Sequence, residues 1–226
     1  MMDILWRASV WVIPVIVAIT FHEAAHGYVA WRLGDDTAKR LGRVSFWPWR
    51  HVDPFGTIIV PALLMLARAP FLFGWAKPVP VDFTALPNPR RDMVYVAAAG
   101  PGINIGLAVL SAALVHLSVL APGIAGVWLT ENLLNSVLIN LVLAVFNMLP
   151  LPPLDGGRVA VGLLPLRLAR PLAAMERIGL FIIIGALFIL PLVGGQLGVN
   201  LNIFPWLIGQ PVEFLYRVVM SMAGHL

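Results

Sequence analysis

Two histidines and a glutamate stand together inside an apolar stretch near the beginning of the chain. His22, Glu23 and His26 form the pattern His-Glu-Ala-Ala-His, directly after the apolar run at residues 10–20. Residues four apart share one face of a helix, so His22 and His26 direct two imidazoles to one point. Two imidazoles and one further ligand hold a catalytic zinc ion and leave a fourth position for water. The pattern predicts such a centre, with Glu23 placed to take a proton from that water.

The same pattern also has a chance explanation. It arises in roughly one sequence in a hundred of this length, and two unrelated core histidines would produce it. Polar groups within an apolar helix are, however, costly in a bilayer unless they serve a function. The zinc interpretation therefore depends on a third ligand elsewhere in the chain.

The composition predicts a membrane protein. The 226 residues are 60% hydrophobic and 12% charged, whereas about a quarter of the residues of a soluble domain are charged. The formal net charge is +4, but Lys and Arg occupy short loops between apolar runs. That distribution is typical of cytoplasmic membrane loops, so we expect a lipid bilayer and no nucleic acid as partner. Cys is absent, and any zinc ion must be held by His and carboxylate side chains.

Apolar runs long enough to cross a bilayer recur along the chain. We predict membrane helices at residues 4–33, 93–120, 133–148 and 178–193, and a fifth at 197–222 that Pro205 and Pro211 interrupt. The fold class is an all-α polytopic membrane protein that forms a single domain over residues 1–226. It comprises a three-helix catalytic core at residues 10–160, a re-entrant segment, and two C-terminal helices at residues 174–222.

The apolar segment at residues 55–74 is either a further span or a re-entrant hairpin. Pro61, Arg68 and Pro70 interrupt it, and basic residues stand on both sides of it. A span would place these two basic groups on opposite sides of the membrane, whereas a hairpin keeps both cytoplasmic, as the positive-inside rule favours. Irregular backbone at membrane depth must be buried in protein or line a cavity, so we expect a hairpin that lies against the active site.

The same rule predicts the orientation of the chain in the plasma membrane. The N-terminus and the loop at residues 121–131 lie outside, and the loops at 34–54, 75–92 and 156–177 are cytoplasmic. Within the first cytoplasmic loop, the composition of residues 42–46 is compatible with an edge strand.

Asp155 is the best candidate for the third zinc ligand. Most acids of the chain lie in loops among bases, whereas Asp155 follows a helix that is uncharged from Leu133 onward. Gly156 and Gly157 come directly after it, and their conformational freedom would let the backbone bend so that the carboxylate turns inward. A loop position in which Asp155 pairs with Arg158 would explain the same residues equally well.

Three motifs follow one another along the predicted core helices. They are His-Glu-Ala-Ala-His at 22–26, Gly-Pro-Gly-Ile-Asn at 100–104, and Asn-Met-Leu-Pro at 147–150 leading to Asp155-Gly156. Together they resemble the site-2 protease family of intramembrane zinc metallopeptidases, over roughly residues 10–160. Residues 51–56 and 74–80 are similar to the compact bacterial branch of that family, and no stretch resembles a PDZ or CBS module.

The resemblance implies a role for each polar residue of these motifs. One Zn²⁺ per chain would be bound by His22, His26 and Asp155, with Glu23 as the general base. The extended substrate backbone or the developing oxyanion would be held by Asn147 and Asn104.

The implied activity is that of a zinc-dependent endopeptidase that hydrolyses peptide bonds within or near transmembrane helices. Its substrate would be a membrane-embedded protein with a single span, or a signal-peptide remnant. Because the carbonyls of a helix are tied up in its own hydrogen bonds, the substrate must first unwind locally. Residues 55–74 and 42–46 are candidates to receive the unwound chain by β-pairing.

A metal transporter or a non-catalytic metal-binding membrane protein is the alternative function, because intramembrane His and Asp also mark ion pathways. Such a conduit needs ligands relayed across the bilayer, whereas these converge at one depth, with Glu23 in the position of a base. A peptidase of the prenyl-protein type should carry a Glu ligand on a later helix, and the sequence has none.

Several polar residues have simpler explanations. Asn104 could equally join two helices by hydrogen bonds. We interpret His51 and Asp53 as a loop-capping pair rather than as an extra metal ligand or gate, His116 as a hydrogen-bonded core residue, and His225 as a tail residue without a function.

Overall fold

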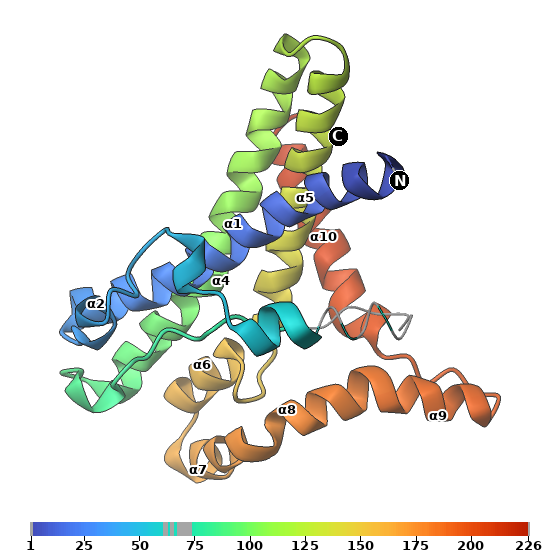
Figure 1. The fold of residues 1–226 in the computed structure, drawn as a ribbon. Helices are drawn as coiled ribbons and strands as arrows, with labels where there is room; N and C mark the ends of the chain where they lie inside the picture. Colours follow the sequence, from blue (N-terminus) through green and yellow to red (C-terminus); the bar gives the residue numbers. More distant parts are fainter. Residues whose placement is uncertain (1, 61–62, 64–65, 67–73, 226) are drawn as a thin grey trace.

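Three long helices form the centre of the structure. The computed structural model describes residues 2–60, 63, 66 and 74–225. Its centre consists of α1 (Met2–Leu33), α4 (Pro89–Val115) and α5 (Gly123–Asn147). Figure 1 shows α4 and α5 side by side, with α1 crossing them obliquely, and all three helices pack against one another. This arrangement confirms the predicted three-helix core.

Among the described residues, four helices are long and apolar enough to cross a membrane: Leu5–Leu33, Pro89–Leu120, Gly123–Asn147 and Glu176–Gln196. Large apolar side chains cover their outer surfaces, for example Ile13 on α1, Leu110 on α4 and Leu138 on α5. A continuous apolar exterior of this kind requires lipid around it. The chain is therefore an all-α, multi-pass membrane protein, as predicted.

The end of α1 redirects the chain back along the helix. Gly34 has a φ of +121°, the N–H of Asp35 bonds to the Ala30 carbonyl at 3.0 Å, and the N–H of Gly34 bonds to the Trp31 carbonyl at 3.2 Å. These two bonds form a Schellman motif, in which glycine tolerates the left-handed conformation. The chain continues through α2 (Thr37–Arg40), η1 (Pro48–Arg50) and η2 (Pro54–Ile59), of which α2 and η1 contact α1.

The edge strand predicted at residues 42–46 is wrong. Gly42 has a φ of +65°, and the N–H of Arg43 bonds to the Ala38 carbonyl at 2.8 Å, so the chain is still turning after α2. The part of the chain that the structure describes contains no strand with which this segment could pair. Its apolar residues pack on α1 instead, where Phe46 stacks on Phe21 with ring centroids 4.6 Å apart.

The two ends of the predicted re-entrant segment lie side by side. The N–H of Trp75 donates to the Gly56 carbonyl at 3.1 Å, and the Thr57 hydroxyl donates to the Trp75 carbonyl at 2.8 Å. The described ends of the segment are thus joined by direct hydrogen bonds. Most of the predicted path between them, residues 61–62, 64–65 and 67–73, lies outside the described residues.

The third core helix begins earlier than predicted, at Gly123 instead of Leu133. Polar residues within or next to the external loop expected at 121–131 bond back into the helix or to α1. Thr130 donates to the Gly126 carbonyl at 2.8 Å, Asn132 donates to the Trp128 carbonyl at 2.9 Å, and Glu131 accepts from the Trp6 indole at 2.8 Å. Polar side chains with partners inside the helix do not end it, so only a tight turn after η4 (His116–Leu120) separates α4 from α5.

Short helices lie where α4 begins and α5 ends, the side that we predict to be cytoplasmic. A 3-10 turn, η3 (Phe83–Ala85), leads into α4. After α5, α6 (Asp155–Leu163) packs against α4, and α7 (Leu166–Ala174) packs against α6. Arg90 at the start of α4 joins these elements, because its guanidinium donates to the carbonyls of Gly162 at 3.2 Å and Leu164 at 2.5 Å. The base of α4 is thereby tied to the end of α6.

The C-terminal part contains two apolar helical units. The first comprises α8 (Glu176–Ile184), η5 (Gly185–Ile189) and α9 (Leu190–Gln196) and runs crosswise to α4 and α5 in Figure 1. The second, η6 (Pro205–Gly209) and α10 (Gln210–Met222), packs on α5 and α4. Pro205 begins this unit and Pro211 follows a π-helical turn. The predicted interruption of this helix at the two prolines is therefore wrong. Widened turns accommodate a residue that lacks an N–H.

Candidate metal centre

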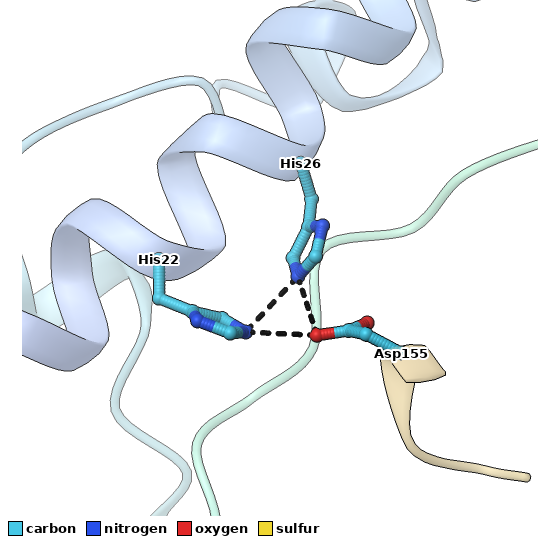
Figure 2. Close-up of side chains that lie close together, drawn as sticks. All are labelled: His22, His26 and Asp155. Atoms are coloured by element: carbon cyan, nitrogen blue, oxygen red, sulfur yellow. Dashed lines mark hydrogen bonds and ion pairs between the residues drawn. The ribbon is translucent and has the colours of Figure 1, made fainter. Parts of the chain in front are cut away.

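His22, His26 and Asp155 converge on one point beside α1. Both histidines project from the same face of α1, and Asp155 is the first residue of α6, as Figure 2 shows. The Nε2 atoms of the two histidines are 3.0 Å apart. The Asp155 Oδ2 atom lies 3.2 Å from His22 Nε2 and 3.3 Å from His26 Nε2. The three residues predicted as ligands are thus brought together from parts of the chain more than 120 residues apart.

The other nitrogen of each imidazole has a partner that decides its protonation. His26 Nδ1 lies 2.7 Å from the Val96 carbonyl, which can only accept, so Nδ1 carries the proton. His22 Nδ1 lies 2.6 Å from Asn104 Oδ1. The orientation of the Asn104 amide is settled by its Nδ2 group, which donates to the Ala18 carbonyl at 3.2 Å. In the neutral rings, both Nε2 atoms therefore present lone pairs to the centre.

The three converging atoms fit a metal ion better than they fit one another. Two imidazole lone pairs and a carboxylate oxygen meet within hydrogen-bonding distance, and the buried Asp155 Oδ2 has no hydrogen-bond donor. Such a set repels itself unless a cation lies between its members. Two histidines and one carboxylate are a protein ligand set of catalytic zinc, which keeps a further position open. These side chains could therefore hold a zinc ion.

Asp155 is suited to be an anionic ligand. Burial raises the pKa of its carboxyl group, but the neighbouring His22 and His26 outweigh burial and hold the pKa below its ordinary value. Its place in the first turn of α6 also favours a negative charge. The alternative pairing with Arg158 is wrong, because the Arg158 guanidinium contacts Glu176 at 3.4 Å.

Gly100 on α4 makes room for the two imidazoles. A Cβ atom at this position would lie 2.5 Å from His26 Nε2 and 2.6 Å from His22 Nε2. No side chain other than hydrogen fits there. The glycine of the Gly-Pro-Gly-Ile-Asn motif is thus explained by the closeness of α4 to the centre.

Glu23 lies next to the centre on α1 and is half-buried. Its Oε2 atom accepts a hydrogen bond of 2.8 Å from the backbone N–H of Val79. Sequence reasoning missed Val79, because a backbone donor leaves no mark in the side-chain pattern. The nearest signal is the pair of prolines that flank it.

The remaining predicted residues lie at varying distances from the centre. Asn104 is fully buried, and besides His22 it contacts Ala18 and Asn140, the latter at 2.7 Å, so it joins three helices. Asn147 lies in the last turn of α5 and donates to the Leu143 carbonyl at 3.0 Å. Within the described ranges no hydrogen bond joins Asn147 to the three converging residues.

The minor histidines have structural partners. His51 bonds to the Ser45 carbonyl at 2.8 Å, and Asp53 separately caps η2 by accepting from the Gly56 N–H at 2.6 Å, so the two are not a pair. His116 was expected in the core but is exposed, and its ring stacks on that of His225 with centroids 4.0 Å apart. His225 Nε2 also lies 2.9 Å from the Ala112 carbonyl of α4, so His225 is not a free tail residue.

Asn104 should be needed for tight zinc binding. In Asn104→Leu, the Nδ1–H of His22 loses its acceptor, and the ring is free to rotate or to carry its proton on Nε2. We expect zinc affinity to fall about 10- to 100-fold, as is usual when a hydrogen bond to a metal-ligating histidine is removed. Chelator competition on purified protein measures this. Ser111→Ala removes a partly buried hydrogen bond to Ser136 that joins α4 to α5 and serves as the control; equal zinc affinity in both variants would contradict the assignment.

The fold and the centre together define a class, that of multi-pass membrane zinc peptidases with an HExxH helix. The chain matches peptidase family M50 over residues 123–191. It is 42% identical over 187 residues to "Putative zinc metalloprotease YwhC" of Bacillus subtilis, covering 80% of each chain. It is 30% identical over 180 residues to "Putative zinc metalloprotease Rip2" of Mycobacterium tuberculosis, covering 80% of this chain and 66% of Rip2. No solved structure was found to match.

The chain belongs to peptidase family M50 and is a zinc metallopeptidase. This confirms the resemblance to the site-2 protease family that the three sequence motifs indicated.

Proposed function

We propose that this protein is a zinc-dependent endopeptidase that cuts membrane-embedded substrates within or near their transmembrane helices. One observation carries the proposal: His22, His26 and Asp155 converge beside α1, a helix that is itself long and apolar enough to span the membrane. A peptidase centre on such a helix can meet a peptide bond at membrane depth. A soluble substrate has no need of a site in this position.

The three converging side chains would hold one zinc ion per chain. When bound, zinc lowers the pKa of a water molecule and polarises a carbonyl group. Glu23 would accept the proton from the attacking water and pass it to the leaving amine. A carboxylate beside the two imidazoles, on the next position of the same helix, is placed for both transfers.

The two asparagines would contribute in different ways. Asn147, half-buried at the end of α5, remains our candidate for binding the substrate backbone or the developing oxyanion. Asn104 is fully buried and its side chain bonds to His22, Ala18 and Asn140. We therefore revise its proposed role from direct substrate contact to orientation of His22.

The proposed substrate is a protein with a single span or a signal-peptide remnant. Its helix must unwind before cleavage, because helical carbonyls are already hydrogen-bonded. The proposed orientation places the N-terminus outside and the loops at 34–54, 75–92 and 156–177 in the cytoplasm of a cell with this protein in its plasma membrane. All of residues 1–226 would form one membrane-embedded domain.

Glu23→Gln should stop cleavage without loss of zinc. Gln keeps the shape of the side chain and an oxygen for the Val79 N–H, but it cannot accept a proton from water. We expect cleavage of a single-span reporter in liposomes to fall about 10²- to 10⁴-fold, as for other general bases. Reporter cleavage and zinc content are measured on the same samples of wild type and variant.

The outcome also separates a peptidase from a transporter. If wild type cuts and the variant binds zinc but does not cut, Glu23 is the base. If both bind zinc and neither cuts a broad panel of single-span helices, the metal transporter becomes the better explanation.

A further inference from the structure

An extended segment passes over α1 beside the centre. We call residues 77–82 the strap. Its first residue donates from the Lys77 N–H to the His51 carbonyl at 2.9 Å, and its last donates from the Asp82 N–H to the Asp35 carboxylate at 2.7 Å. Asp35 is itself buried, with 1% of its surface exposed. Both ends of the strap are therefore fixed to the rest of the protein.

The middle of the strap contacts the proposed general base. The Val79 N–H donates to Glu23 Oε2 at 2.8 Å. The Val79 side chain packs at Gly27, one helical turn further along α1, where an added Cβ would come within 3.0 Å of it. Val79 stands between Pro78 and Pro80, and prolines have no N–H and a fixed φ. The sequence Pro-Val-Pro thus offers a single backbone donor in a stiff segment, and that donor points at Glu23.

A buried arginine holds the strap from the other side. The Arg43 guanidinium donates from Nη2 to the Lys77 carbonyl at 2.6 Å and to the Pro78 carbonyl at 3.3 Å. Only 8% of Arg43 is exposed, and its Nε is buried without a partner. Burying a cation is costly unless acceptors receive its hydrogen bonds. Here the acceptors are the carbonyls of Lys77 and Pro78, directly before Val79, and the arginine holds both in place.

We propose that Arg43 and the Val79 N–H act as a clamp that positions Glu23 for proton transfer. The strap holds one carboxylate oxygen of Glu23 and leaves the other to exchange protons with water. Glutamate has several rotamers of similar energy, and a base that leaves its reacting geometry for much of the time is a slow one. Arg43 and Val79 are positioning residues, since they act through Glu23. This inference rests on the proposed function of Glu23 as the base.

Replacing the Val79 N–H tests the clamp. Val79→Pro removes the donor, and a backbone ester introduced at Val79 removes it without adding a ring. In the full-length protein in liposomes, we expect kcat for a single-span reporter to fall about 10- to 100-fold, the scale of a small misplacement of a catalytic group. KM and zinc content should stay within about twofold of wild type. An ester at Ala76 is the matched control, because that N–H makes no hydrogen bond within the described residues.

Arg43 provides a second, independent variant. Arg43→Met should lower kcat in the same way, and Arg43→Lys should recover part of the loss because an ammonium can still donate to both carbonyls. A role confined to folding would reduce zinc content and the amount of folded protein together with kcat, and that result would overturn the clamp.

The results also distinguish this inference from the function on which it rests. If Glu23→Gln still cuts, the proposed role of Glu23 fails. If Glu23→Gln is inactive but the Val79 ester cuts as fast as the Ala76 ester, only the clamp fails. A rise in kcat on removal of the Val79 N–H would mean that the strap restrains the enzyme, and it would overturn the clamp as well.

Discussion

Gly100→Ala is expected to abolish zinc binding under conditions in which wild type is fully loaded. The new methyl group would lie 2.5 Å from His26 Nε2 and 2.6 Å from His22 Nε2, the atoms that present lone pairs to the centre. The rings cannot simply turn aside. Their Nδ1 atoms are bonded to the Val96 carbonyl and to Asn104, and Asn104 is itself fully buried. We expect a loss of zinc affinity of at least about 100-fold, beyond the usual effect of removing a hydrogen bond to a ligand.

Gly102→Ala is the control for this substitution. It lies on the same helix, and an added Cβ there meets nothing within 4 Å. Alanine is a better helix former than glycine by about 1 kcal/mol, so this variant should keep its zinc and unfold at an equal or higher temperature. Zinc content after gel filtration, followed by chelator competition, measures the difference. Zinc affinity near the wild-type value in Gly100→Ala would show that α4 does not set the position of the imidazoles.

The part of the centre that is local in sequence could be predicted from sequence. His22 and His26 share a helical face because they are four residues apart, and the long apolar run around them predicted that the segment is a helix. Asp155 could not be placed in this way, because its position depends on the packing of α6 against α4 and against the backbone that follows α5. Only its motif, the lack of competing acids and the need for an anionic ligand favoured it over a loop residue.

The contacts that could not be predicted from sequence are those of glycine, which has no side chain beyond a hydrogen atom, and those of backbone N–H groups. Gly100 belongs to the Gly-Pro-Gly-Ile-Asn motif, but nothing in that pattern names the imidazoles as its neighbours. Val79 acts through its N–H, which all residues except proline possess. Conversely, residues 121–131 were expected to form an external loop, while in the structure Thr130 and Glu131 lie in α5 and have partners in that helix and on α1.

Gly156 and Gly157 show how a correct residue can be given a wrong reason. Their flexibility was expected to bend the backbone after Asp155. Both are instead helical residues of α6, and neither is among the glycines with positive φ. Their small size is what matters, because a Cβ at Gly156 would overlap the Met148 carbonyl and come within 2.6 Å of the Leu149 carbonyl oxygen. The first turn of α6 rests directly on the backbone that follows α5.

Gly156→Ala should therefore displace Asp155 and cost the protein both zinc and stability. The atoms that the methyl group meets belong to the backbone and cannot rotate away, so α6 must move as a unit. We expect a destabilisation of about 1–3 kcal/mol, the usual effect of overpacking, and a large loss of zinc affinity because Asp155 moves with the helix. Thermal unfolding in detergent and chelator competition measure the two effects.

Gly185→Ala is the matched control, because it is also a helical glycine and a Cβ there meets nothing within 4 Å. If Gly156→Ala loses zinc while Gly185→Ala keeps it, the third ligand is positioned by the contact between α6 and the end of α5. Added chelator should then lower the unfolding temperature of wild type and Gly185→Ala, but change that of Gly156→Ala little, since zinc stabilises only a protein that binds it. Equal responses in all three proteins would mean that Asp155 is held in place by something other than this helix contact.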